Sequence, residues 1–210
     1  MRTDRRRMML AKFKNIEFVY NNGAYIDTGL PEGDYVFNIK CSTLETSPWV
    51  FPFVKSQKAT GNADRYYCGI NNDYGDGDKR YKLIVQGCGA TFDNFDAQNI
   101  LVPTDENIFE FQLGTNPYTY WFKLNGKYII SPRQGKKDYF KDKTVKLFFD
   151  EVMLGYGKIY HIRIYSSDRK DIIQDYVPVI SLHTGKAGLL EKVHNKFYNK
   201  GTNGFEFTEC

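Results

Sequence analysis

The sequence predicts an all-β protein built from two antiparallel sheets that pack face to face. Aromatic residues make up 16% of the chain, and such side chains pack well on a pleated sheet but lose rotamer freedom on a helix. Short segments alternate apolar and polar residues with a period of two, which is typical of strands with one buried face. Clusters of Gly, Asn, Asp and Pro separate these segments, as turns between strands require.

The alternating segments follow one another along the chain, and each is expected to bury one face and expose the other. Roughly a dozen such short strands in one chain suit a two-sheet sandwich. In chain order the predicted buried sets are Ile16, Phe18 and Tyr20; Tyr35, Phe37, Ile39 and Cys41; Tyr81, Leu83 and Val85; Phe109, Phe111 and Leu113; Tyr118, Tyr120, Phe122 and Leu124; Val145, Leu147 and Phe149; and Tyr160, Ile162 and Ile164, with His161 and Arg163 opposite the last set.

The connections between segments carry their own signals. Asn125-Gly126 separates two apolar runs, and both residues accept the positive φ of a type I′ hairpin turn. Pro52 lies inside the run WVFPFV, which predicts a sheet edge or a bulge, because proline cannot donate a ladder hydrogen bond. Only Ala187–Val193 favours a helix, of at most two turns. The polar segments predicted as loops are Ser56–Arg65, Asn71–Arg80 and Pro132–Lys143.

The net charge of +4 is concentrated at the N-terminus. The first twelve residues carry five basic residues and one acidic residue, whereas the remaining 198 carry 24 of each. A nucleic-acid-binding protein spreads or clusters Lys and Arg over its fold, so this distribution argues against that class. We interpret residues 1–14 as a basic, extended arm and residues 15–210 as a single sandwich domain.

Composition also bears on the compartment of the protein. No run of about 18 apolar residues occurs, so no membrane-spanning segment is expected. Lys12 interrupts the short apolar stretch that follows the first basic residues, which argues against a secretory signal. The four cysteines, Cys41, Cys68, Cys88 and Cys210, lie far apart without a C-x-x-C pair, which predicts reduced thiols rather than a disulfide framework.

One acidic cluster could hold calcium. Asp73, Asp76 and Asp78 lie close together among Asn and Gly residues, and Ca²⁺ takes six to eight oxygen ligands. The spacing of an EF-hand and its closing Glu are missing. The same composition is typical of a solvated turn between strands. Calcium is therefore a weak candidate, and no other cofactor is predicted.

Motifs of common enzyme classes are absent from the sequence, including G-x-S-x-G, H-E-x-x-H, Walker A and G-x-G-x-x-G. Glu110, Asp150 and Glu151 lie on or beside predicted strands. They could form the paired carboxylates of a glycoside hydrolase, which stand roughly 5–10 Å apart. Exposed acids on a strand more often belong only to its solvent face. We predict that the protein is not an enzyme.

The N-terminal arm is the second candidate for function. Its three consecutive arginines suit contacts with carboxylates or phosphates, because guanidinium is planar and donates several hydrogen bonds. Contact with nucleic acid would be weakened strongly by salt at so few charges. A solvated tail is the alternative for any terminus. We predict that the arm binds a protein partner through Arg5, Arg6, Arg7, Met8, Met9 and Leu10.

Two stretches resemble the concanavalin A-like, or laminin-G-like, jelly-roll modules of tailed phages, prophages and gut bacteria. The first is Asn22–Leu30, which contains YIDTG. The second runs from Gly157 to Asn199 and contains GKIY, IY, DYVPV, GLLEKV and KFYN in that order. The resemblance extends from Ile16 to about Phe207, although residues 42–105 match no motif. The usual Tyr-Asp of the late motif is replaced here by Leu190-Glu191.

The resemblance implies a jelly-roll sandwich with a binding or structural role and no catalytic residues. We therefore expect a non-enzymatic component of a tailed-bacteriophage virion, made in the host cytoplasm and attached through its arm to other virion proteins. It would be a capsid-associated auxiliary protein or a tail- or fibre-associated protein. The alternative is a carbohydrate-binding, lectin-like module for host or mucosal glycan, in which exposed Tyr and Trp stack on sugars.

Overall fold

The computed structural model describes residues 12–43, 50–56, 67–73, 80–86, 93–96, 105–113, 119–134, 143–148 and 156–209. The regular secondary structure in these ranges is all β, which confirms the predicted fold class. Among the described residues, no helix has the length and apolar character needed to cross a membrane. The strands are β1 (Phe13–Asn15), β2 (Val19–Asn22), β3 (Ile26–Pro31), β4 (Tyr35–Thr43), β5 (Val50–Ser56), β6 (Tyr67–Asp73), β7 (Arg80–Gln86), β8 (Asp93–Asp96), β9 (Asn107–Leu113), β10 (Thr119–Leu124), β11 (Lys127–Gln134), β12 (Thr144–Leu147), β13 (Tyr156–Ser166), β14 (Ile172–Ser181), β15 (Ala187–Glu191), β16 (Lys196–Tyr198) and β17 (Phe207–Thr208).

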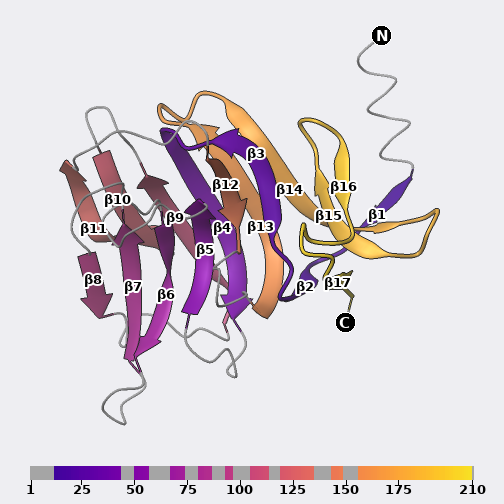
Figure 1. The fold of residues 1–210 in the computed structure, drawn as a ribbon, viewed down its shortest axis with the longest axis horizontal. Coiled ribbons are helices and arrows are strands. Elements are labelled where there is room, and N and C mark those ends of the chain that lie inside the picture. Colours follow the sequence, from indigo (N-terminus) through magenta and orange to yellow (C-terminus); the bar gives the residue numbers. More distant parts are fainter. Residues whose placement is uncertain are drawn as a thin grey trace.

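The strands form two antiparallel sheets, as expected for a jelly-roll sandwich. The larger sheet has the order β11-β10-β9-β4-β13-β14-β15-β16, with β1, β2 and β17 attached near β13 and β14. The smaller sheet has the order β3-β12-β5-β6-β7-β8. Figure 1 shows the two sheets lying one in front of the other, while β14, β15, β16 and β1 extend to one side.

The core between the sheets is rich in phenylalanine. Phe37, Phe111 and Phe122 come from three neighbouring strands and stack in a row, with ring centroids 5.1 and 5.8 Å apart. Phe53 of the smaller sheet packs on Phe109 at 4.4 Å. All five side chains are buried. The predicted alternation is confirmed on β9. On β4 and β10 the predicted residues from Phe37 and Tyr120 onward are buried, but Tyr35 is only half-buried, and Val36 and Trp121 on the opposite face are buried too. Aromatic pairs of the kind seen in this core add about 0.5–1.5 kcal/mol beyond burial alone.

A buried chain of hydrogen bonds also links the two sheets. The Tyr176 hydroxyl donates to Gln174 Oε1 at 2.8 Å, and Gln174 Nε2 donates to the carbonyl of Thr28 at 2.9 Å. The Thr28 hydroxyl then donates to the carbonyl of Val145 at 2.7 Å. Burial raises the pKa of Tyr176 far above its ordinary value, so the hydroxyl remains a donor. The chain joins β14 to β3 and β12 with every polar atom in it paired.

The predictions for the Asn125-Gly126 turn and for Pro52 are both confirmed. Asn125 and Gly126 join β10 to β11 with φ of 49° and 80°, which is the left-handed geometry of a type I′ turn. The register shifts between Pro52 and Val54, so Pro52 does lie at a bulge. Of the two predicted alternatives, an edge or a bulge, the structure has the bulge, since β5 pairs with β12 on one side and β6 on the other.

The predicted helix at Ala187–Val193 is wrong. Residues Ala187–Glu191 form β15, which pairs with β14 and β16 and is buried at every position. A Cβ at Gly188 would collide with the backbone of Tyr198, so the glycine allows β16 to approach. Pairing on both edges outweighs the weak local preference for helix. The run of buried residues came from burial on both faces rather than from a helical stripe.

Candidate binding pocket at the fork of two strands

The candidate site forms where β13 and β14 separate. These strands pair only over Ile162–Tyr165 and Ile172–Tyr176. Beyond that point β13 pairs with β2 and β14 pairs with β1, so residues 13–22 fill the gap. We call this junction the fork. At the fork, the amide of Ile16 donates to the carbonyl of Pro178 at 3.2 Å. Since N–H and C=O of a strand residue point to the same side, the missing N–H of Pro178 also faces the gap.

A β-bulge at Tyr160 shapes the same junction. Ile159 pairs with Cys41 and His161 pairs with Lys40, so Tyr160 has no partner on β4. The extra residue brings two consecutive side chains to one face. Ile159 is buried in the core whereas Tyr160 and His161 are half-buried. The predicted buried set on this strand is therefore wrong at Tyr160, which lies with His161 on the outer face of the larger sheet.

The prediction is also wrong for the N-terminal segment. The buried side chains of β2 are Val19 and Asn21, whereas Phe18 and Tyr20 are only half-buried. The Phe18 ring packs edge-on against Tyr160, with centroids 5.6 Å apart and an interplanar angle of 62°. Phe18 and Tyr160 therefore form an aromatic cluster on the outer face of the larger sheet, next to the fork.

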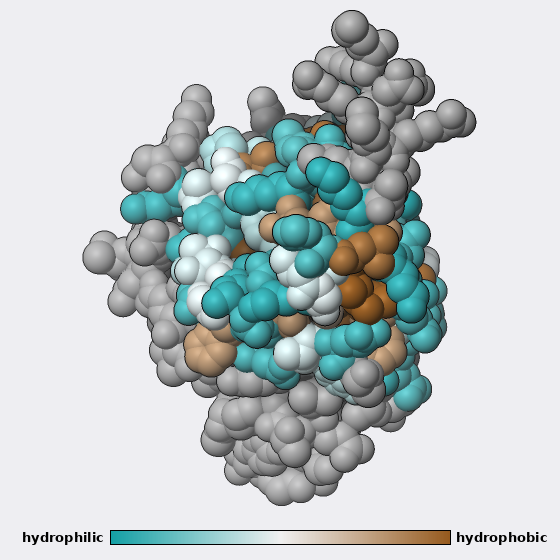
Figure 2. Space-filling model, turned by 90° about the vertical axis from the view of Figure 1, so that its right-hand side faces the viewer, coloured by the Kyte–Doolittle hydropathy of each residue, from teal (hydrophilic) through white to brown (hydrophobic). Residues whose placement is uncertain are grey.

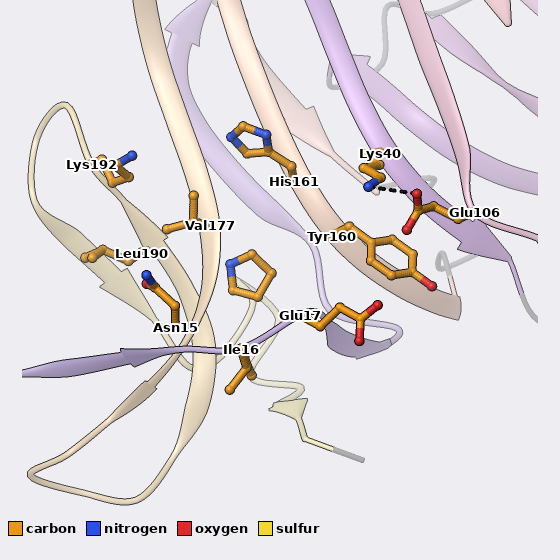
Figure 3. A pocket seen from close by; sticks show the side chains of 11 residues that line it. Asn15, Ile16, Glu17, Lys40, Glu106, Tyr160, His161, Val177, Leu190 and Lys192 are labelled. Atoms are coloured by element: carbon orange, nitrogen blue, oxygen red, sulfur yellow. Dashed lines mark ion pairs between the residues drawn. The ribbon is translucent and has the colours of Figure 1, made fainter. Parts of the chain in front are cut away.

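A pocket of about 420 Å³ opens at the fork. Figure 3 shows the side chains that line it, which come from β1, β4, β13, β14 and β15 and from the segments beside them. We call it the fork pocket. One part of its wall is apolar and another carries charged and amide groups. The lining residues are Asn15, Ile16, Glu17, Lys40, Glu106, Tyr160, His161, Val177, Pro178, Leu190 and Lys192.

Tyr160 occupies the polar side of the pocket, between Glu17 and Glu106 (Figure 3). Lys40 Nζ lies 2.7 Å from Glu106 Oε1 and 5.5 Å from the centre of the Tyr160 ring. Partial burial, together with the negative charges of Glu106 and Glu17, raises the pKa of Tyr160 above its ordinary value. At neutral pH the ring is therefore uncharged and its hydroxyl keeps its proton.

Asp175 holds the opposite side in place. Its Oδ1 lies 2.6 Å from His161 Nε2 and 3.1 Å from Arg163 Nε, and its Oδ2 lies 3.2 Å from Lys192 Nζ. Burial opposes the ionisation of Asp175, but the hydrogen bond from His161 and the nearby positive charges outweigh it and hold the pKa well below its usual range. The carboxylate therefore stays charged and fixes His161 and Lys192 at the wall of the pocket.

Two polar groups in the wall remain available for a ligand. In the part of the chain that the structure describes, the side chains of Asn15 and Glu17 have no hydrogen-bond or ion-pair partner, and both residues are exposed. An amide supplies donors and an acceptor, and a carboxylate supplies acceptors. Together with an aromatic ring and an apolar wall, these groups suit the recognition of a small polar molecule.

The acids considered for glycoside hydrolysis do not meet in this pocket. Glu110 lies on β9 and contacts Arg169 at 2.7 Å and Lys123 at 3.4 Å. Partial burial opposes its ionisation, but its hydrogen bond with Arg169 and the nearby cations lower the pKa. A charged Glu110 among cations cannot supply the proton that a general acid must. Asp150 and Glu151 lie outside the described residues.

The other residues predicted from the sequence are placed as follows. Asp73 ends β6, and its side chain is outside the description, as are Asp76 and Asp78. Among the described residues, no group of three His, Cys, Asp or Glu could hold a metal ion. The arm residues Arg5, Arg6, Arg7, Met8, Met9 and Leu10 also lie outside the described residues.

The fork pocket itself was missed by the sequence interpretation. Its walls come from residues about 160 positions apart, such as Asn15 and Val177. The available signal was the tripeptide Ile159-Tyr160-His161, in which a bulge would break the alternation.

The fold is shared with solved structures of known proteins. No protein-family model matches the chain, and no curated protein sequence matches it. The enzymatically active domain of tailspike protein 2 from bacteriophage CBA120 has a TM-score of 0.54 and 11% identity, covering 75% of this chain and 26% of that one. The full-length tailspike protein 2 gives the same TM-score and identity, with 23% of its length covered.

A carbohydrate-binding module has a weaker structural similarity. The CBM40 domain of the Ruminococcus gnavus IT-sialidase, bound to α2,3-sialyllactose, has a TM-score of 0.49 and 14% identity, covering 77% of this chain and 91% of that one. At 11% identity the similarity to the tailspike shows the fold alone. This chain spans about a quarter of the tailspike domain that it matches.

Proposed function

We propose that this protein is a non-enzymatic component of a tailed-phage virion, associated with the capsid, tail or fibre and attached through its N-terminal residues. The sequence motifs that resemble phage and prophage modules form β13, β14, β15 and β16, which are consecutive strands of the larger sheet. A sandwich of the same fold occurs in a phage tailspike, so the fold suits a virion protein.

The observation that supports attachment through the N-terminal residues is that residues 12–15 are fixed to the sandwich. Phe13–Asn15 pair with Val179–Ser181 as β1. The carbonyl of Lys12 accepts a hydrogen bond from the amide of Leu182 at 2.9 Å, and the Phe13 ring packs on Phe197 at 5.0 Å. A segment that precedes Lys12 therefore leaves the body at a defined point. Once the body is near its partner, docking of this segment is intramolecular, which raises its effective concentration.

The test is incorporation into phage particles that encode this chain. Particles made with the full chain and with a chain lacking residues 2–11 are purified, and the protein per particle is measured by mass spectrometry. We expect at least about a tenfold loss, since losing one of two linked contacts costs about 10²–10⁴ in avidity. A Glu17→Gln chain is the matched control and should be incorporated normally. Equal incorporation of the truncated and full chains contradicts the proposal.

Carbohydrate binding is a second candidate, and the fork pocket is the observation that favours it. The pocket combines the Tyr160 ring, an apolar wall and the side chains of Asn15 and Glu17, which have no hydrogen-bond partner among the residues that the structure describes. Such combinations are typical of sites that orient a small ligand by a few polar groups. The test is a glycan array probed with the full chain. Saturable binding to a defined glycan supports this function, and an array without binding contradicts it.

A further inference from the structure

We propose that the fork pocket binds a neutral sugar in its pyranose form, with Tyr160 against the ring and Asn15, Glu17 and the Lys40–Glu106 pair on the hydroxyl groups. This inference rests on carbohydrate binding, the second candidate function. It adds the site and the chemical class of the sugar, uncharged rather than acidic.

The shape of the pocket fits a small, partly apolar ligand. Its volume of about 420 Å³ lies within the range of roughly 300–1,000 Å³ typical of small-molecule sites. Ile16, Val177 and Leu190 supply apolar surface from three different segments. A pyranose has one face rich in C–H groups and a rim of hydroxyls, so it needs such a mixed wall.

The Tyr160 ring is held in place before any ligand arrives. The bulge keeps it on the outer face, and Phe18 packs edge-on against it at 5.6 Å. The electron-rich face of an aromatic ring attracts the slightly positive C–H groups of a sugar. A ring that is already fixed loses little conformational entropy on binding.

The charges of the pocket favour an uncharged ligand. Lys40 pairs with Glu106 at 2.7 Å, and Lys192 shares Asp175 with Arg163, at 3.2 Å, so both lysines already have a carboxylate partner. Glu17 adds a carboxylate with no hydrogen-bond or ion-pair partner among the described residues. An acidic sugar would bring its own carboxylate next to Glu17 and Glu106, and like charges at such short distances repel each other.

A hydroxyl group suits the same surroundings well. It donates and accepts hydrogen bonds at once, so it can donate to a carboxylate and accept from an ammonium group. The Lys40–Glu106 pair presents both kinds of group 2.7 Å apart. Asn15 and Glu17 add donors and acceptors from the facing segment. Neighbouring hydroxyls of a pyranose can engage these groups without any change of net charge.

The test compares sugars that differ only at C6. The full chain is titrated by NMR with methyl β-glucoside against methyl β-glucuronide, and with methyl β-galactoside against methyl β-galacturonide. We expect a neutral sugar to bind at least about tenfold more tightly than its acidic counterpart. Tighter binding of an acidic sugar than of its neutral counterpart overturns the inference, and so does the failure of both neutral sugars to bind.

Variants then locate the site. Tyr160→Leu should weaken neutral-sugar binding at least about tenfold, whereas Tyr128→Leu, at an exposed tyrosine on β11, should leave it unchanged. Because Glu17 is exposed and has no hydrogen-bond or ion-pair partner in the described part of the chain, Glu17→Gln should fold normally. It should reduce the ratio of neutral-sugar to acidic-sugar affinity about threefold or more. If the protein binds a glycan and none of the pocket variants alters that binding, the fork pocket is not the sugar-binding site, but carbohydrate binding still holds. If no glycan on the array binds, both proposals are wrong.

Discussion

The clearest stability prediction concerns Glu191. Its side chain is almost fully buried at the end of β15. Oε1 accepts from the amides of Asp175 at 3.1 Å and Val193 at 2.9 Å. Oε2 accepts from the amide of His194 at 2.7 Å and from His194 Nδ1 at 2.8 Å. One carboxylate thus holds the β15–β16 turn against β14.

Replacing Glu191 by Gln leaves Oε1 in place but turns Oε2 into an amide donor. Two hydrogen bonds to a charged acceptor are lost, each worth about 1.5–3 kcal/mol. Partial rearrangement offsets some of this loss, so we expect the free energy of unfolding to fall by about 2–4 kcal/mol. In a domain of this size that corresponds to roughly 5–15 °C in Tm.

The assay is urea unfolding at pH 7, followed by circular dichroism. The matched control is Glu206→Gln, because Glu206 is exposed and pairs with Lys186 and Lys200 at 3.0 and 3.5 Å. Exposed pairs contribute about 0–1 kcal/mol. If Glu191→Gln costs no more than Glu206→Gln, the turn does not depend on the buried carboxylate and the reasoning fails.

Three further predictions follow from the described structure. Gln174→Leu should lower the free energy of unfolding by about 1–3 kcal/mol, because it removes two buried hydrogen bonds, one from the Tyr176 hydroxyl and one to the Thr28 carbonyl; an unchanged urea midpoint contradicts this. Because the pKa of Asp175 is lowered in the folded state, its contribution is complete above about pH 4 and disappears as the pH falls. Asp175→Asn should therefore be less stable than the parent at pH 6, and this difference in the free energy of unfolding should be clearly smaller at pH 2; a difference that does not change with pH contradicts the ion pairs. Gly126→Ala should cost about 1 kcal/mol, because φ is +80° there, and thermal unfolding at the parent's Tm would contradict the turn assignment.

The core was predictable because period-two patterns report burial directly. Phe37, Ile39 and Cys41 are buried on β4 as predicted, and so are Phe109, Phe111 and Leu113 on β9. The thiol of Cys41 is buried and free, as is that of Cys68, and burial raises the pKa of both. The burial of these side chains follows from the pattern within a single strand, so it could be predicted from the sequence alone.

The candidate site was not predictable in the same way. One extra residue at Tyr160 shifts the alternation, so a residue read as core lies on the outer face. Every residue of β15 is buried. Its sequence therefore lacks the alternation of apolar and polar residues that indicates a strand, and a helix was predicted in its place. The fork depends on which strands separate, and pairing partners such as Asn15 and Val179 lie too far apart in sequence for local patterns to report.

Competition between two chains for the same particles tests the central proposal most directly. Equal amounts of the full chain and of a chain without residues 2–11, distinguished by isotopic labelling, are offered to particles assembled without the protein. The account predicts at least about a tenfold excess of the full chain in purified particles. A ratio near one would show that the body attaches without the arm and would contradict the proposed mode of attachment.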